Sequence, residues 1–430
     1  MYRMYRLFLI AWIAATASAA APPAWVERSN RNAKILLDVQ ARFAPEAAAR
    51  TGVEGIDREV VDLKAGFRER SREATRKAIG ALREKLDAET DARVRQDLEI
   101  LIRAAELDVK ESVLSEKYTL PYFDVTRFVF GGIRSLLDDQ IATDRRPAAL
   151  VRLRRYAGME EGYAPLAKLA EERIRERLSQ PGLLAPFNGE IEKSLADSQF
   201  LLDGIEPLFR KFGVDDYEEP LAKLKTQIAA YHDFVCREIL PKARTDFRLP
   251  EELYALSLEQ YGNDMPPAAL AQRARGAFLE IQGQMQEIAG QVAREREWSF
   301  AGYRDVIREL KKKQLVGDAI LPHYEQRLAQ IEEIVRRENL VTLPGRPARI
   351  RIASAAESAA VPAPNMRPPR LIGNAGESGE FVLPLNVPDT SGKMKSFDDF
   401  TFEAASWTLT AHEARPGHEM QFASIVEQGV

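Results

Sequence analysis

Apolar residues recur at every third or fourth position over long stretches of this sequence, for example at Val94, Leu98 and Ala105. A helix with 3.6 residues per turn gathers such positions on one face, which can then be buried against a neighbouring element. The same spacing predicts further helices over residues 56–67 and 268–297. Their other faces are densely charged, as is typical of helices exposed to solvent. We therefore expect a mainly α fold.

The composition changes after Asn339. Many prolines and several glycines lie between Val341 and Pro388, and they exclude long helices from that stretch. We therefore expect a helical body over residues 20–340 and a proline- and glycine-rich segment with short strands over residues 341–395. Residues 396–430 are expected to form the helices that carry the motif described below.

Two stretches inside the proline-rich segment have the pattern of β-strands. Residues 349–352 (RIRI) alternate strictly, and residues 380–385 (EFVLPL) are rich in strand-forming types. Pro384 has no backbone N–H to donate, which predicts an edge strand. The free edge of a sheet can align an extended peptide. A small structural hairpin is an equally good interpretation.

The N-terminus has the layout of a secretory signal peptide, predicted over residues 1–19. It begins with Arg3 and Arg6, continues with an apolar stretch over residues 7–15, and ends in small residues. A permanent membrane span needs about 20 apolar residues, more than this stretch contains. We therefore expect cleavage of the signal, export to the periplasm, and no stable membrane insertion afterwards.

The charge balance argues against a nucleic-acid-binding protein, and the cysteine content excludes a protein stabilised by internal disulfides. Lys and Arg total 61 against 65 Asp and Glu, so no net basic field is present to hold nucleic acid. The lysine run at residues 311–313 is better interpreted as a solvated helix face than as a binding patch. A single cysteine, Cys236, allows no internal disulfide. Its neighbours favour a small helical core residue over a nucleophile.

The histidines give the sharpest chemical signal. Only four occur in the chain, and His412 and His418 lie six residues apart, with Glu413 directly after the first. In the zinc-peptidase motif H-E-x-x-H, two histidines one helical turn apart bind zinc and the glutamate activates the metal-bound water. The spacing is longer in this chain. On a straight helix His418 would lie about 120° around from His412, too far to share an ion.

A proline and a glycine at positions 416–417 offer a way around this problem. A break there can swing His418 back toward His412. If the helix stayed straight, Glu419 would fall nearest to His412 and would offer a carboxylate to the metal instead. We favour His418 as the ligand. Ser396, followed by two aspartates, is typical of a helix start, so the motif helix is expected to run from there to about Ala414.

Residues 409–421 (LTAHEARPGHEMQ) resemble the signature of the bacterial family catalogued as domain of unknown function 885. Its members are regarded as zinc metallopeptidases related to the helical gluzincins, and many carry export signals. The resemblance extends upstream through residues 381–385 and 362–364 and the helical region from about Leu249. It implies a large multi-helix, zincin-like body with a small β insert beside the motif helix. It also implies that His412 and His418 bind one zinc ion and that Glu413 is the catalytic base.

Two departures from the family pattern concern the ligands. Many relatives have a second histidine where this chain has Glu419. The pattern also expects a glutamate ligand on a helix further downstream, whereas the sequence stops at Val430. Catalytic zinc sites usually take three protein ligands, so either the sequence is truncated or the third ligand comes from elsewhere. Glu427 is the only other downstream carboxylate, and reaching the site would require a bent helix end.

These observations predict an exported zinc-dependent hydrolase, and most specifically a metallopeptidase that acts on a peptide or another amide. Glu413 would take a proton from the metal-bound water and pass it to the leaving amine. Two other functions stay open. One is a helical binding or scaffold protein that retains the motif without activity, and the other is a zinc amidase or esterase.

The other histidines and two of the tryptophans are given structural interpretations. His232 and His323 lack partners at ligand spacing. Trp298 and Trp407 sit in helix-like patterns, which favours a place in the core over a ligand platform.

Overall fold

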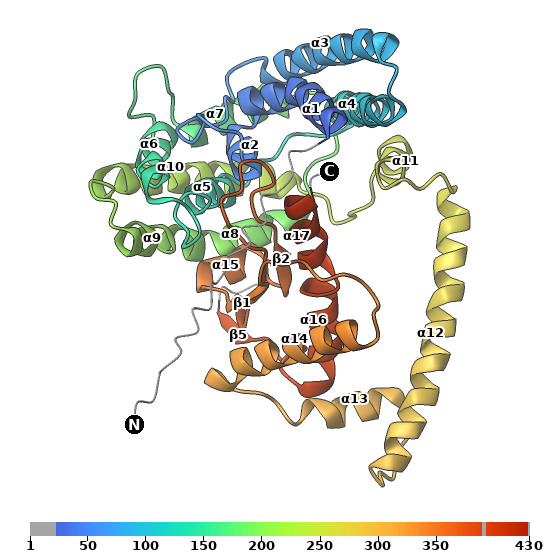
Figure 1. Cartoon of the computed structure of the whole chain (residues 1–430). Coiled ribbons are helices and arrows are strands. Elements are labelled where there is room, and N and C mark those ends of the chain that lie inside the picture. Colours follow the sequence, from blue (N-terminus) through green and yellow to red (C-terminus); the bar gives the residue numbers. More distant parts are fainter. Residues whose placement is uncertain (1–22, 389–392, 429–430) are drawn as a thin grey trace, which may run out of the picture.

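The computed structural model describes residues 23–388 and 393–428, so the predicted signal peptide lies outside the described residues. Helices make up most of the described chain and only a few short strands accompany them, which confirms the mainly α prediction (Figure 1). Within the described ranges, no helix combines the length and the apolar character that crossing a membrane requires.

The first part of the chain is a body of packed helices. Its largest core contains Leu153, Phe209 and Phe234, all essentially buried. A second core, around Leu82 and Leu98, holds α1, α3 and α4 together. The elements of this part are α1 (Ala24–Phe43), α2 (Pro45–Thr51), α3 (Phe67–Ala88), α4 (Ala92–Tyr118), α5 (Val125–Arg134), η1 (Thr143–Arg145), α6 (Ala148–Tyr156), α7 (Leu166–Leu178), α8 (Asn188–Asp203), α9 (Ile205–Phe212), α10 (Glu218–Phe234), η2 (Val235–Ile239) and η3 (Leu240–Lys242).

The helix predicted over residues 56–67 is absent, and α3 begins only at Phe67. Leu63 is nevertheless buried in the largest core. Arg152 donates from Nε to the Glu59 carbonyl at 3.2 Å, and Arg173 donates from Nη1 to the Leu63 carbonyl at 2.6 Å. Arginines distant in sequence thus satisfy backbone groups that a helix would otherwise have paired.

A long helix, α12 (Pro267–Glu295), stands along one side of the molecule between α11 (Glu251–Gln260) and α13 (Tyr303–Lys311) (Figure 1). It confirms the helix predicted over residues 268–297. Ala289 is buried against α13, whereas Phe278 and Ile281 on the same helix are exposed. The chain then passes through η4 (Gly317–Ala319) into α14 (Ile320–Arg337).

The proline-rich segment contains a three-stranded sheet with the order β1-β3-β2. In it, β1 (Arg349–Ile352) runs parallel to β3 (Glu380–Leu383), and β2 (Asn365–Arg367) runs antiparallel to β3. The two predicted strands are confirmed, but the prediction of an edge strand is wrong, because β3 is the central strand. It ends at Leu383, so Pro384 follows the ladder and removes no hydrogen bond from it.

The two faces of this sheet meet different parts of the molecule. Ile350 and Phe381 pack into an apolar core with α14 and with residues next to the motif helices. On the other face, Arg367 donates to Asp138, which follows α5 in the helical body, at 2.8 Å. Successive side chains of a strand point to opposite faces, so the sheet contacts the core beside the motif helices with one face and the helical body with the other.

The motif helices are α16 (Glu403–Glu413) and α17 (His418–Gln428), and α16 packs against α14. The remaining elements are α15 (Ala355–Ala360), β4 (Asn386–Pro388) and β5 (Met394–Ser396). The predicted helix start at Ser396 is wrong, because Ser396 ends β5. Asp398 and Asp399, which were expected in the first turn of the helix, instead form ion pairs with Lys311.

Candidate metal centre

A turn over residues 414–417 separates α16 from α17 and confirms the predicted break. The helix ends at Glu413, and a new helix begins at His418. Pro416 and Gly417 both lie in the turn, where proline lacks the N–H that a continuing helix would use.

This turn brings the two motif histidines together. The ring centroids of His412 and His418 lie 4.7 Å apart, and the ring planes are nearly perpendicular at 89°. The His412 side chain is 64% exposed, and His418 is also exposed. Because a straight helix would set the two side chains about 120° apart, the break creates this pair.

Gly417 allows the turn to close this tightly. A Cβ atom at this position would lie 1.8 Å from the His412 carbonyl oxygen and 2.4 Å from that of Ala411. Contacts this short are impossible, so any side chain larger than hydrogen would push the turn away from the end of α16. The glycine of the sequence motif therefore has a steric role next to His412.

Glu413 lies beside the histidine pair. One of its carboxylate oxygens, Oε1, is 3.8 Å from Nε2 of His412. The Glu413 side chain is only 12% exposed, in contrast to the open imidazole of His412. The site therefore places two imidazoles and one largely shielded carboxylate next to each other at a helix break.

Arg415, which the sequence did not single out, fixes this turn from the inside. Its guanidinium is almost fully buried and donates from Nε to Glu419 at 2.6 Å and from Nη1 to Glu332 of α14 at 2.8 Å. It also donates to the Arg346 carbonyl. Burial lowers the pKa of Arg415, but Glu419 and Glu332 more than reverse this effect, and the pKa ends above its ordinary value. In the sequence, only the four-residue spacing between Arg415 and Glu419 indicated the ion pair between them.

The two carboxylates considered as further metal ligands have other partners. Glu419 is fully buried in its ion pair with Arg415. Glu427 accepts hydrogen bonds from the backbone N–H groups of Gly345 at 3.1 Å and Arg346 at 2.8 Å. Within residues 23–388 and 393–428, no group of three His, Cys, Asp or Glu side chains is placed to hold a metal ion.

The other two histidines have contacts in keeping with their structural interpretation. His323 Nε2 lies 3.0 Å from Ser406 Oγ and so links α14 to α16, and burial lowers the pKa of His323. His232 Nε2 lies 3.4 Å from Thr126 Oγ1 in the helical body.

Two of the predicted core residues are not in the core. Cys236 is exposed, because Val235 and Ile239 take the buried positions of η2. Trp407 is 38% exposed and is covered by the Arg327 guanidinium, whose carbon lies 3.8 Å from the ring centroid. Trp298 does pack, half-buried, against the small core between α12 and α13.

Comparison with known proteins gives one family and one fold. A family model described as "Bacterial protein of unknown function (DUF885)" matches residues 45–430. No curated protein matches the chain. The solved structure described as "The crystal structure of the putative lipoprotein from Colwellia psychrerythraea" is similar, with a TM-score of 0.64 and 14% sequence identity. The match covers 93% of this chain and 74% of that one, and at this identity it shows a likeness of fold alone.

Proposed function

The chain belongs to the DUF885 family of bacterial proteins, and from this and its histidine pair we propose that it is an exported zinc-dependent hydrolase, a metallopeptidase with Glu413 as general base. One observation carries the proposal. The break between α16 and α17 turns His412 and His418 toward each other beside a carboxylate, although their spacing would separate them on a continuous helix.

The chemistry of the donor set fits zinc. Imidazole nitrogens are among the preferred ligands of this ion. The rings of His412 and His418 are exposed, so an ion can reach them from solvent. A catalytic zinc usually has three protein ligands and one open position for water. The two histidines would fill two of these positions, and within the described ranges no third side chain is placed to complete a metal-binding group with them.

Zinc bound here would acidify a water molecule and polarise the scissile carbonyl. Glu413 lies beside the pair and would take the proton of the attacking water and then deliver it to the leaving amine. The low exposure of its side chain restricts the positions that the carboxylate can adopt. Arg415 and Gly417 would act as positioning residues, because they hold the turn that aligns the two imidazoles.

Substitution of Glu413 by glutamine tests the proposal. The amide has nearly the same size but cannot take up the proton, so the variant should bind one equivalent of zinc while hydrolysis falls at least about 100-fold. Zinc content by atomic absorption and hydrolysis of an unfolded protein substrate are the two measurements. His412→Ala and His418→Ala should lose the zinc as well.

Glu403→Gln is the matched control, because Glu403 is an exposed carboxylate at the start of the same helix. It should keep both the zinc and the activity. Full hydrolysis by Glu413→Gln would exclude Glu413 as the base.

A second candidate is a helical binding or scaffold protein that retains the motif without activity. The observation in its favour is that the described residues hold no third metal ligand beside the pair. Metal-free protein with normal folding would support the scaffold. One equivalent of zinc and chelator-sensitive hydrolysis would support the enzyme. Cleavage of small amides or esters but not of peptides would indicate a zinc amidase or esterase.

A further inference from the structure

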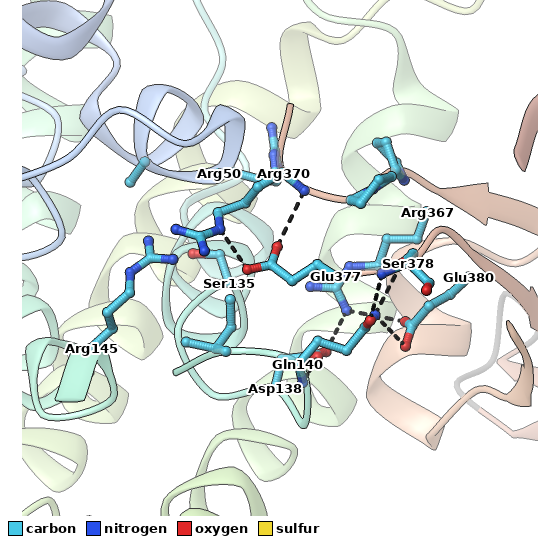
Figure 2. Close-up of a pocket in the computed structure, with 14 residues that line it drawn as sticks. Arg50, Ser135, Asp138, Gln140, Arg145, Arg367, Arg370, Glu377, Ser378 and Glu380 are labelled. Atoms are coloured by element: carbon cyan, nitrogen blue, oxygen red, sulfur yellow. Dashed lines mark hydrogen bonds and ion pairs between the residues drawn. The ribbon is translucent and has the colours of Figure 1, made fainter. Parts of the chain in front are cut away.

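A pocket rich in guanidinium groups lies where the helical body meets the charged face of the sheet (Figure 2). Its walls come from the end of α2, the segment after α5, η1, β2 and the loop between β2 and β3. Arg50, Arg145, Arg367 and Arg370 all line it. Neither His412 nor His418 lines this pocket.

Three of these arginines have guanidinium N–H groups without a hydrogen-bond acceptor among the described residues. Arg145 donates from Nε and Nη2 to Asp57, both at 2.7 Å, but its Nη1 is buried without a partner. Arg370 uses Nε on Glu377, and its two terminal nitrogens bond to none of the described residues. Arg50 is exposed and makes no hydrogen bond or ion pair with any residue that the structure describes.

The carboxylates around the pocket cannot supply the missing acceptor, because other donors already hold them. Glu377 accepts from both Nε and the backbone N–H of Arg370. Asp138 accepts from Arg367 at 2.8 Å and lies 3.2 Å from Arg134. Glu380, the third carboxylate of the pocket, accepts from Arg351 at 2.8 Å. Each of the three is thus neutralised by an arginine, and N–H groups of Arg50, Arg145 and Arg370 remain without an acceptor among the described residues.

The loop that carries Arg370 is fixed against the helix that carries Arg50. The backbone N–H groups of Leu371 and Ile372 both donate to the Thr51 carbonyl at 3.0 Å. Gly52, at φ +117°, permits this approach, since a Cβ there would lie 2.0 Å from the Ile372 carbonyl oxygen. The positions from which the guanidinium groups reach the pocket are therefore set by the fold.

Guanidinium N–H groups that lack an acceptor and line the same pocket favour a negatively charged ligand. A buried N–H without an acceptor costs free energy, and guanidinium forks match the paired oxygens of carboxylate and phosphate groups. Figure 2 shows Arg145 and Arg370 reaching into the pocket from opposite walls. A water molecule would satisfy one N–H but would not offset the charge of Arg50, which pairs with no carboxylate among the described residues.

We propose that this pocket binds a small oxyanion, a phosphate or a carboxylate group, through Arg50, Arg145 and Arg370. The pocket volume of about 40 Å³ suits a small ion better than a peptide. The site would work whether or not zinc binds at the histidine pair, because the two sites share no residue.

Calorimetric titration of the full chain with inorganic phosphate, at constant ionic strength, tests the proposal. A parallel titration uses acetate, and chloride gives the baseline. We expect saturable binding of at least one oxyanion, with an affinity about tenfold lower or worse in Arg50→Ala. Binding of phosphate alone would identify a phosphate site, and equal binding of acetate a site for a carboxylate group.

Arg50→Ala is suited to this test because the side chain is exposed and its removal leaves no buried group unpaired. Arg275→Ala, which removes an exposed arginine on α12, is the matched control and should bind like the wild type. A second variant, Arg145→Lys, keeps the positive charge beside Asp57 but lacks the planar guanidinium with its several N–H groups. It should therefore also weaken oxyanion binding. No saturable binding of either oxyanion, or binding that Arg50→Ala leaves unchanged, would overturn the proposal.

Discussion

At the scale of single residues, Arg415 is the contact that ties the motif turn to the rest of the molecule. Its guanidinium neutralises Glu419, which is fully buried, and reaches Glu332 on α14. Replacing Arg415 by methionine would keep the bulk of the side chain but leave the Glu419 carboxylate buried and unpaired. We expect the free energy of unfolding to fall by about 3–5 kcal/mol, measured by urea denaturation.

The double variant Arg415→Met/Glu419→Gln is the control for this prediction. It removes the uncompensated charge and should recover part of the loss, which a double-mutant cycle would report as coupling between the two residues. A loss below about 1 kcal/mol in Arg415→Met would show that this ion pair does not hold the turn.

The residues of the candidate site could be predicted where the signal is local in the sequence. His412, Glu413, the Pro416-Gly417 break and His418 all fall within seven positions, so helix geometry alone tests whether they can meet. Glu332 could not be found in this way. It lies 83 residues before Arg415, and only the packing of α14 against α16 brings the two together.

At the scale of elements, the approach of α17 to the end of α16 depends on Gly417. In Gly417→Ala the added methyl group would overlap the His412 carbonyl, so the turn must open and the two imidazoles must separate. We expect zinc affinity, measured by competition with a chelator, to fall at least about tenfold while the protein stays folded.

Gly276→Ala is the matched control, because a Cβ at that position of α12 meets nothing within 4 Å. It should leave zinc binding unchanged, and it should raise stability by up to about 1 kcal/mol because alanine favours a helix interior. Unaltered zinc affinity in Gly417→Ala would contradict the steric role given to this glycine.

The sequence predicts a helix or strand correctly where the buried residues of that element show the pattern by themselves. The spacing of Val94, Leu98 and Ala105 predicts α4 because these residues share one buried face. Residues 56–66 have similar spacing but are irregular, because distant arginines bind their carbonyl groups. Ser396 likewise ends a strand, since the aspartates after it pair with Lys311. Such errors reflect tertiary partners, which local propensity does not contain.

At the scale of the whole molecule, ion pairs hold the charged face of the sheet against the helical body. Glu357, at the start of α15, accepts two hydrogen bonds from Arg351 of β1, at 2.8 and 3.1 Å, and pairs with Arg134 of α5. Burial alone would raise the pKa of the Glu357 carboxyl. Arg134, Arg351 and the Ser354 backbone N–H outweigh it and lower the pKa to about 2.

This shift predicts a pH dependence of stability. The folded-state pKa of Glu357 lies below the unfolded-state value of about 4.5, so its charged form stabilises the fold above that pH. The contribution, roughly 3 kcal/mol, is lost as the pH falls from 4.5 toward 2. Glu357→Gln lacks this group, so the difference in unfolding free energy between wild type and variant should shrink over that range. A difference that stays constant between pH 5 and pH 2.5 would contradict it.

Locating the metal in a crystal would show whether His412 and His418 bind the same zinc ion. Crystals grown with zinc and measured on both sides of the zinc absorption edge would show its position by anomalous scattering. The proposal predicts one strong peak about 2.0–2.1 Å from an imidazole nitrogen of each histidine. Zinc bound elsewhere, or no peak between the two rings in excess zinc, would contradict it.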